Sequence, residues 1–137
     1  MIYIGIDAGT KTGFAAWDNR LKKFLQITTL QIHEAMRIVS DYKDHNIYVR
    51  VEDARKRTWY GKMSREQERS KLQGVGSVKR DCSIWDDFLK DLGVRYEMVE
   101  PKRNVTKLSH EQFVNLTGYD KRTNEHSRDA AMLVFGF

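Results

Sequence analysis

Hydrophobic and polar positions at the amino end of the chain follow the two-residue period of β-strands. Isoleucine occupies every second position from residue 2 to residue 6, which predicts a first strand that ends at Asp7. Turn-like residues 8–13 lead to a second strand at 14–17, and the Asp-Asn-Arg turn at 18–20 leads to a third at 24–28. Three strands in such close succession predict an antiparallel meander.

Helical patterns alternate with two further strands in the rest of the chain. Apolar spacing predicts a helix at 31–43, a strand at 47–52 and a long helix from about 65 to 92. Apolar residues of the long helix step by three and four positions, the pattern of a seam that packs on a sheet or another helix: Val75, Val78, Cys82, Trp85, Leu89 and Leu92. Gly74 and Gly76 interrupt its helix-forming residues, which indicates either close approach of another backbone or a break in the helix.

The carboxyl-terminal third adds one strand and two helices. Residues 96–99 form the strand, Ser109 caps a helix that ends at Gly118, and Thr123 is the expected cap of the last helix. The last helix has an apolar face made of Ala130, Ala131, Leu133 and Val134. The order β-β-β-α-β-α-β-α predicts a single α/β domain over residues 1–137 with one mixed sheet.

Composition limits the class of protein. The chain has 137 residues, of which 40% are hydrophobic and 31% charged, as expected for a soluble domain. No apolar run is long enough to cross a membrane, and the amino end lacks the pattern of a secretory signal. The single cysteine, Cys82, excludes an internal disulfide and a cysteine-rich zinc site. We therefore expect a cytoplasmic protein without a membrane partner.

The positive charge of the chain is concentrated in one segment. The net charge is +5, and residues 55–80 alone contain nine basic and two acidic side chains. Such a concentration is typical of proteins that bind a polyanion, most often nucleic acid. The alternative is an ordinary solvated helix face.

Two acidic residues end predicted strands. If the strands that end at Asp7 and Glu52 are parallel neighbours, both carboxylates project at the edge where open α/β sheets bind ligands. His126 and Asp129 share one face of the last helix, which could pack across that edge. Asp53 is a rival to Glu52, but strand alternation points it to the opposite face. Taken singly, these acids could instead cap turns or pair with lysines, and His126 could be a surface residue.

Converging carboxylates repel one another unless cations lie among them. Oxygen ligands of this kind select Mg²⁺ or Mn²⁺, and two such ions suit the hydrolysis of a phosphodiester bond. The basic segment would then hold the nucleic-acid backbone over the ions. We expect no small-molecule cofactor.

Three motifs resemble those of the RuvC-like Holliday junction resolvases of the ribonuclease H-like superfamily. Ile4–Gly13 (IGIDAGTKTG) resembles the first motif of that family, Val49–Glu52 (VRVE) its second acidic strand, and His126–Ala131 (HSRDAA) its final helix motif. The element order fits across essentially the whole chain. Ala8 stands where bacterial members usually have proline, and the chain ends eight residues after Asp129, so the resemblance is to a phage-type or divergent member.

The resemblance implies a ribonuclease H-like fold, a five-stranded mixed sheet flanked by helices, and an enzyme of DNA recombination and repair. It implies that Asp7, Glu52 and Asp129 bind metal with His126 as a fourth member, and that two Mg²⁺ ions serve each active site, with Mn²⁺ as a substitute. It implies a homodimer that cuts four-way or other branched DNA and leaves 5′-phosphate and 3′-hydroxyl ends. The glycine-bearing helix resembles the family's dimer-forming helix; the alternative is that its seam is ordinary core.

Further residues are candidates for contact with DNA. Trp59 and Tyr60 could stack on unpaired bases, or they could pack on the sheet. The basic candidates are Lys11, Arg55, Lys56, Arg57, Lys62, Lys102, Arg103 and Lys107. The last three follow the fifth strand, where they could reach phosphate near the metal ions or simply be solvated.

Three other functions remain open. The Asp-x-Gly-Thr-x-Thr-Gly pattern also resembles the phosphate loop of actin-like ATPases and sugar kinases, which need a second such domain that this chain lacks room for. A junction-binding module of the same fold would bind branched DNA without cutting it. A ribonuclease H would cut RNA–DNA hybrids, although the His-x-x-Asp pair on the last helix favours the resolvase.

Overall fold

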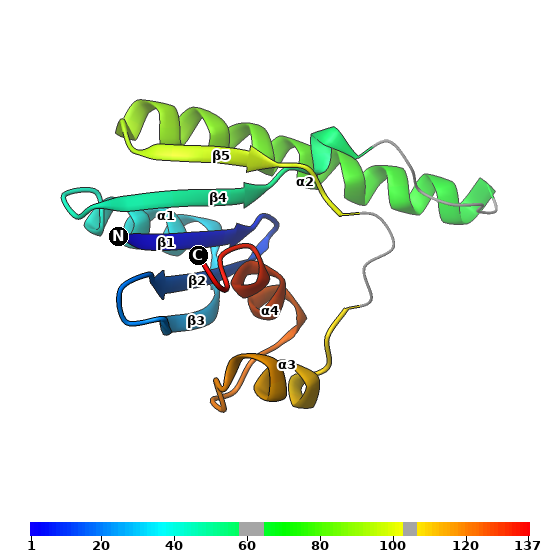
Figure 1. The fold of residues 1–137 in the computed structure, drawn as a ribbon. Helices are drawn as coiled ribbons and strands as arrows, with labels where there is room; N and C mark the ends of the chain where they lie inside the picture. Colours follow the sequence, from blue (N-terminus) through cyan, green and yellow to red (C-terminus); the bar gives the residue numbers. More distant parts are fainter. Residues whose placement is uncertain (58–64, 103–106) are drawn as a thin grey trace.

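The computed structural model describes residues 1–57, 65–102 and 107–137, with a five-stranded sheet at its centre (Figure 1). The strands lie in the order β3-β2-β1-β4-β5. They are β1 (Ile2–Asp7), β2 (Lys11–Asp18), β3 (Lys23–Gln31), β4 (Ile47–Glu52) and β5 (Arg95–Val99). The helices are α1 (Ile32–Asp41), the 3-10 helix η1 (Ala54–Lys56), α2 (Arg65–Leu92), α3 (His110–Thr117) and α4 (Glu125–Met132).

The sheet is mixed, as the sequence predicts. Strands β1, β2 and β3 pair antiparallel in chain order, and they form the predicted meander. Strand β4 pairs parallel with β1, and β5 pairs parallel with β4. Helix α1 connects β3 to β4 and α2 connects β4 to β5, because parallel strands need a long crossover. The five-stranded α/β arrangement is therefore confirmed.

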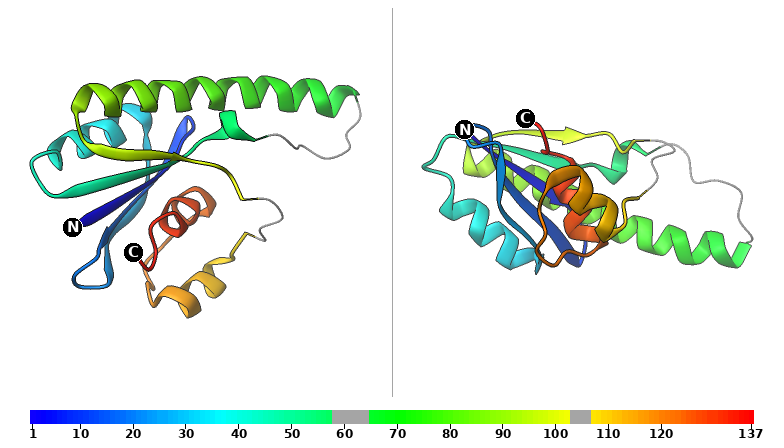
Figure 2. Two further views of the ribbon diagram at one scale, coloured as in Figure 1. Left: turned by 45° about the horizontal axis from the view of Figure 1, so that its top comes forward. Right: turned by 60° about the horizontal axis from the view of Figure 1, so that its bottom comes forward.

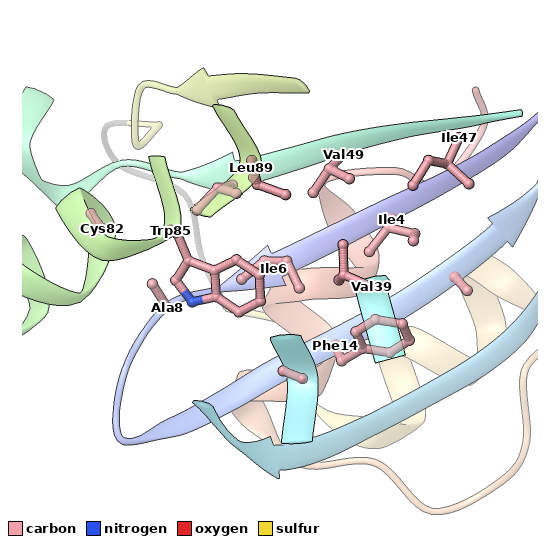
Figure 3. Packing of buried hydrophobic residues seen from close by; sticks show 13 residues of the cluster. Ile4, Ile6, Ala8, Phe14, Val39, Ile47, Val49, Cys82, Trp85 and Leu89 are labelled. Carbon is pink, nitrogen blue, oxygen red and sulfur yellow. The ribbon is translucent and has the colours of Figure 1, made fainter. Parts of the chain in front are cut away.

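Helices α1 and α2 cover one face of the sheet. Strand alternation points Ile4 and Ile6 of β1 to this face, where both are fully buried. Trp85 and Leu89 of α2 are also fully buried and point toward the strands (Figure 3). With Cys82, they confirm the predicted apolar seam over the part of α2 whose side chains are described.

Helix α4 lies on the opposite face, across β1, β2 and β3 (Figure 2). Ala130 and Val134 are fully buried there together with Phe113 of α3. The predicted apolar face is confirmed, although Leu133 and Val134 follow the end of α4. The half of the sheet that contains Asp7 therefore lies between two helical layers.

Helix α2 is continuous over 28 residues, with the bounds that the sequence predicts. The expectation that Gly74 or Gly76 breaks it is wrong. The other explanation, close approach of a backbone, finds no support within the described chain, since a Cβ at either glycine would meet no atom within 4 Å. The amino-terminal half of α2 projects beyond the sheet (Figure 1). None of the described helices combines the length and apolar character that crossing a membrane requires.

Several element ends differ from the sequence prediction. Strand β2 begins at Lys11 rather than residue 14, because Lys11 pairs with Gln31 of a β3 that is also longer than expected. Ser109 and Gly118 cap α3 as predicted, with Gly118 in the left-handed conformation. The cap of α4 is Asn124, so the prediction of Thr123 is wrong.

Candidate functional site

Asp7 and Glu52 end two neighbouring parallel strands. Ile6 of β1 is opposite Val51 of β4, and the two acids follow these partners directly. Because successive strand residues alternate between faces, both carboxylates project on the α4 side of the sheet. This is the arrangement that the sequence predicts.

Helix α4 adds His126 and Asp129 to the same edge of the sheet. His126 Nδ1 lies 3.1 Å from Asp7 Oδ2. The start of the helix is fixed by Asn124, whose side-chain oxygen accepts a hydrogen bond from the backbone N–H of Ser127 and another from the Thr29 hydroxyl of β3, at 2.9 and 2.8 Å. The cap thus places the first turn of α4 beside Asp7.

Two glycines allow α4 to approach the sheet so closely. A Cβ at Gly13, the partner of Asp7 on β2, would lie 2.0 Å from the carbonyl oxygen of His126. A Cβ at Gly5 would lie 2.0 Å from the carbonyl oxygen of Ala130. Only glycine leaves room for the helix backbone at these two positions. Their role follows from tertiary contact, so the sequence pattern alone gave no sign of it.

Lys107 is the positive charge among these acids. Its ammonium group lies 2.8 Å from Asp129 Oδ2 and 2.7 Å from Glu125 Oε1. Burial by itself would lower the pKa of Lys107, but hydrogen bonds to the two carboxylates outweigh burial and raise it. Lys107 was expected to contact phosphate, whereas in this structure it pairs with acids. Glu125 was not among the predicted site residues; its position beside His126 was the available signal.

Burial and neighbouring charges shift the pKa values of two of these acids, Asp7 and Glu52. Burial raises the pKa of Asp7, and repulsion by Asp129 adds to the shift against the hydrogen bond from His126. Burial also raises the pKa of Glu52, with further contributions from the charges of Asp7 and Asp129. Asp7 and Glu52 therefore resist ionisation, chiefly because they are buried and in addition because other acids lie near them.

The donor chemistry of this edge fits a hard divalent cation, since carboxylate oxygens and one imidazole are the available ligands. The side chains are not yet arranged as a set of metal ligands. Among residues 1–57, 65–102 and 107–137, no three His, Cys, Asp or Glu side chains lie close enough together to hold a metal ion as they stand. Asp7 instead pairs with His126, and Asp129 with Lys107.

The predicted DNA-contact residues fall into different environments. Lys11 and Lys102 are exposed, on β2 and after β5. Lys56 donates a 2.6 Å hydrogen bond to the carbonyl oxygen of Met98, and Arg57 is exposed at the end of η1. Arg55 is bound to carboxylates of its own chain. Four of the predicted residues lie outside the described part of the chain: Trp59, Tyr60, Lys62 and Arg103.

Comparison with solved structures identifies the architecture. T. thermophilus RuvC in complex with a Holliday junction substrate superimposes with a TM-score of 0.56 over 97% of this chain and 90% of that chain, at 16% sequence identity. The fold is RuvC-like. The order of strands, the three antiparallel strands and the flanking helices of this chain are those of the ribonuclease H-like class. No protein-family model and no curated protein matches the sequence.

Proposed function

We propose that this protein is a metal-dependent endodeoxyribonuclease that cuts four-way or other branched DNA. The observation that carries the proposal is the convergence of Asp7, Glu52, His126 and Asp129 from β1, β4 and α4 at one edge of a RuvC-like sheet. The solved structure of T. thermophilus RuvC, which has this fold, holds a Holliday junction substrate, and this favours branched DNA as the ligand of the site.

Mutual repulsion among the acids supports a role in binding cations. The raised pKa values of Asp7 and Glu52 are unfavourable for folding, and such shifts are more typical of functional sites than of structural positions. In this structure the ammonium of Lys107 offsets part of the charge, because it lowers the pKa of both Asp7 and Glu52 against the opposing effects. Two Mg²⁺ or Mn²⁺ ions bound by the same acids would supply an activated water and stabilise the leaving oxygen.

The residues of the chain have separate tasks in this scheme. Asp7 and Glu52 are fixed by paired strands, so they form the rigid part of the ligand set. His126 and Asp129 sit on α4, and His126 orients the Asp7 carboxylate through their hydrogen bond. Lys107 would exchange Asp129 for the phosphate of a bound strand and keep Glu125, which lies outside the proposed ligand set, as its partner.

A homodimer would give one active site for each of two opposed strands. The projecting half of α2 is the candidate surface for the second subunit (Figure 2). Light scattering on the purified protein is expected to give twice the 16.1 kDa mass of one chain. A mass of 16.1 kDa for the protein at micromolar concentration would contradict the dimer.

Substitution of the three acids tests the nuclease proposal. Asp7→Asn, Glu52→Gln and Asp129→Asn are each expected to lower the rate of junction cleavage at least 10³-fold, on the order of the loss of a key transition-state contact. Junction binding in Ca²⁺ should persist, because DNA affinity comes mainly from phosphate contacts. Asp44→Asn, an exposed acid in the loop after α1, is the matched control and should cut at the wild-type rate.

Substrate choice separates the related functions. Labelled four-way junction, flap, linear duplex and RNA–DNA hybrid are incubated with the protein in Mg²⁺ and in Mn²⁺. Cleavage of the junction or flap with 5′-phosphate ends is the expected result. Preferred cleavage of the hybrid would identify a ribonuclease H instead, and tight junction binding without nicking in either metal would identify a binding module.

A further inference from the structure

A second charged cluster lies on the opposite face of the sheet from the proposed active site, directly behind Glu52. It consists of five side chains from η1 and its capping residue, from α2 and from β5: Asp53, Arg55, Ser83, Asp86 and Tyr96. We call this cluster the Arg55 clamp. None of its members belongs to the proposed ligand set.

The centre of the clamp is a two-bond pair between Arg55 and Asp53. Arg55 Nε donates to Asp53 Oδ1 and Arg55 Nη2 donates to Asp53 Oδ2, both at 2.8 Å. The backbone N–H of Arg55 also donates to Asp53 Oδ1, at 3.0 Å, so that Asp53 caps η1. Burial alone would raise the pKa of Asp53, but the hydrogen bonds from Arg55 outweigh it and lower the pKa. Asp53 is only 1% exposed, and its lowered pKa favours the ionised form.

The outer half of the clamp binds α2 and β5. Arg55 Nη2 donates a 2.9 Å hydrogen bond to Asp86 Oδ2, and Nη1 lies 3.3 Å from the Ser83 hydroxyl. The Tyr96 hydroxyl donates to Asp86 Oδ1 at 2.6 Å. Hydrogen bonds from Tyr96 and Arg55 lower the pKa of Asp86. Four of the five guanidinium N–H donors are therefore used within the chain, which leaves little of Arg55 for a phosphate.

The clamp acts on the peptide segment that carries Glu52. Asp53 follows Glu52 directly, and alternation makes the two side chains point to opposite faces. The backbone of this segment is also held by two bonds: the N–H of Asp53 donates to the carbonyl oxygen of Val99 at 2.7 Å, and Cys82 Sγ donates to the carbonyl oxygen of Glu52 at 3.5 Å. Fixing Asp53 on one face thereby fixes the direction of Glu52 on the other.

We infer that Arg55 is a positioning residue that holds Glu52 in the proposed ligand set through Asp53, and that it is not a DNA-contact residue. The inference rests on the proposed function for the role of Glu52. It changes the expectation for the basic segment, where Arg55 was grouped with Lys56 and Arg57. The clamp also links α2, the candidate dimer helix, to the active-site edge, since Ser83 and Asp86 belong to α2.

The variants remove the clamp in steps. Asp86→Ala and Tyr96→Phe remove the outer half and keep the buried pair of Asp53 and Arg55. Arg55→Gln removes the centre, and Arg55→Lys keeps the charge without the planar fork. Asp87→Ala, at an exposed neighbouring position of α2, is the matched control.

The first measurement is hydrogen exchange in metal-free protein, which does not depend on the proposed function. Asp86→Ala and Tyr96→Phe are expected to speed exchange at the amides of residues 52–57 severalfold, with β1 unchanged. Exchange equal to wild type in both variants would overturn the positioning role. Should Arg55→Gln fail to fold, these two variants still decide the question.

The second measurement is calorimetric titration with Mn²⁺ and the salt dependence of junction binding. Arg55→Gln and Arg55→Lys are expected to weaken Mn²⁺ binding of the folded protein about 10-fold, the usual effect of losing a residue that orients a ligand. The salt slope should stay at the wild-type value. A slope reduced by about one unit would show that Arg55 contacts a phosphate, and it would overturn the inference. Wild-type protein that binds no Mn²⁺ would defeat the proposed function, while hydrogen exchange would still test the clamp.

Discussion

At the scale of single residues, the carboxylates of Asp7 and Glu52 oppose folding when no cation is bound. Both pKa values are raised, first by burial and then by the other acids. A raised pKa means that the folded protein binds the proton more tightly than the unfolded chain does. The free energy of unfolding therefore falls as the pH rises from the ordinary value of the group through its folded value. Sites that bind ions or substrates commonly carry such a loss of stability.

Removing one of these charges should stabilise the metal-free protein. Glu52→Gln is expected to melt a few degrees above wild type in EDTA at pH 7. The difference should be absent below pH 4.5, the ordinary pKa of the group, and should grow as the pH rises through the raised folded value. Thermal denaturation followed by circular dichroism from pH 4 to 8 measures it. Addition of Mn²⁺ should stabilise wild type more than the variant, and a lower melting temperature for Glu52→Gln in EDTA would contradict the argument.

At the scale of elements, the position of α4 decides whether the site forms. The helix supplies His126 and Asp129, and its distance from the sheet is set by the two glycines beneath it. Ala130 and Ala131 are small and fully buried at the same contact, so the helix backbone rather than a long side chain rests on β1 and β2. Because the packing is this close, even one added methyl group would displace α4 and the side chains that it carries.

Gly13→Ala tests the close approach. The added Cβ would overlap the carbonyl oxygen of His126, so α4 must shift. We expect a loss of stability of about 1–3 kcal/mol and cleavage reduced more than 10-fold at temperatures where the variant is folded. Gly74→Ala is the control for stability, because the space around it is open and alanine favours a helix by roughly 0.5–1 kcal/mol. Wild-type stability of Gly13→Ala would mean that α4 does not lie this close.

At the scale of the whole molecule, charge is divided between the acidic edge of the sheet, where we propose the active site, and a basic segment that follows Glu52 in the chain. Lys56 ends η1 and Arg57 follows it, four and five residues after Glu52. Strands of DNA that reach the acids would therefore pass these cations, which release counterions when they contact phosphates. Lys56 donates to the carbonyl oxygen of Met98, whereas Arg55 is held by carboxylates.

The salt dependence of junction binding should show whether Lys56 and Arg57 contact DNA. The double variant Lys56→Gln and Arg57→Gln is expected to lower the slope of log affinity against log salt concentration by up to about two units. Lys43→Gln, an exposed lysine in the loop after α1, serves as the control and should leave the slope unchanged. Fluorescence anisotropy with a labelled junction in Ca²⁺ at several salt concentrations measures the slope. Equal slopes for wild type and the double variant would place the DNA path elsewhere.

Local pattern was enough to predict most of the fold. The two-residue period of β1 and β4, and the three-four period of α2, reflect which side chains are buried, so these elements could be predicted from sequence. The roles of Ser109 and Gly118 as caps of α3 could also be predicted, because a capping residue bonds to the adjacent turn of its own helix. The prediction that Thr123 caps α4 failed because side chains outside its own turn decide its partner. The Thr123 hydroxyl interacts with Arg128 and His110, and the neighbouring Asn124 caps α4.

The candidate site depended on tertiary structure to a greater degree. Strand ends and their acids follow from sequence, but charge alone does not tell which partner a cation will meet. Lys107 and Arg55 were both candidates for contact with DNA, yet one pairs with Asp129 and the other with Asp53. Those pairings join residues through packed elements, and the two glycines under α4 matter only because a helix backbone happens to rest on them. Short-range periodicity in the sequence indicates which side chains are buried. The partner of a polar side chain depends on which other segments of the same chain pack beside it in the tertiary structure.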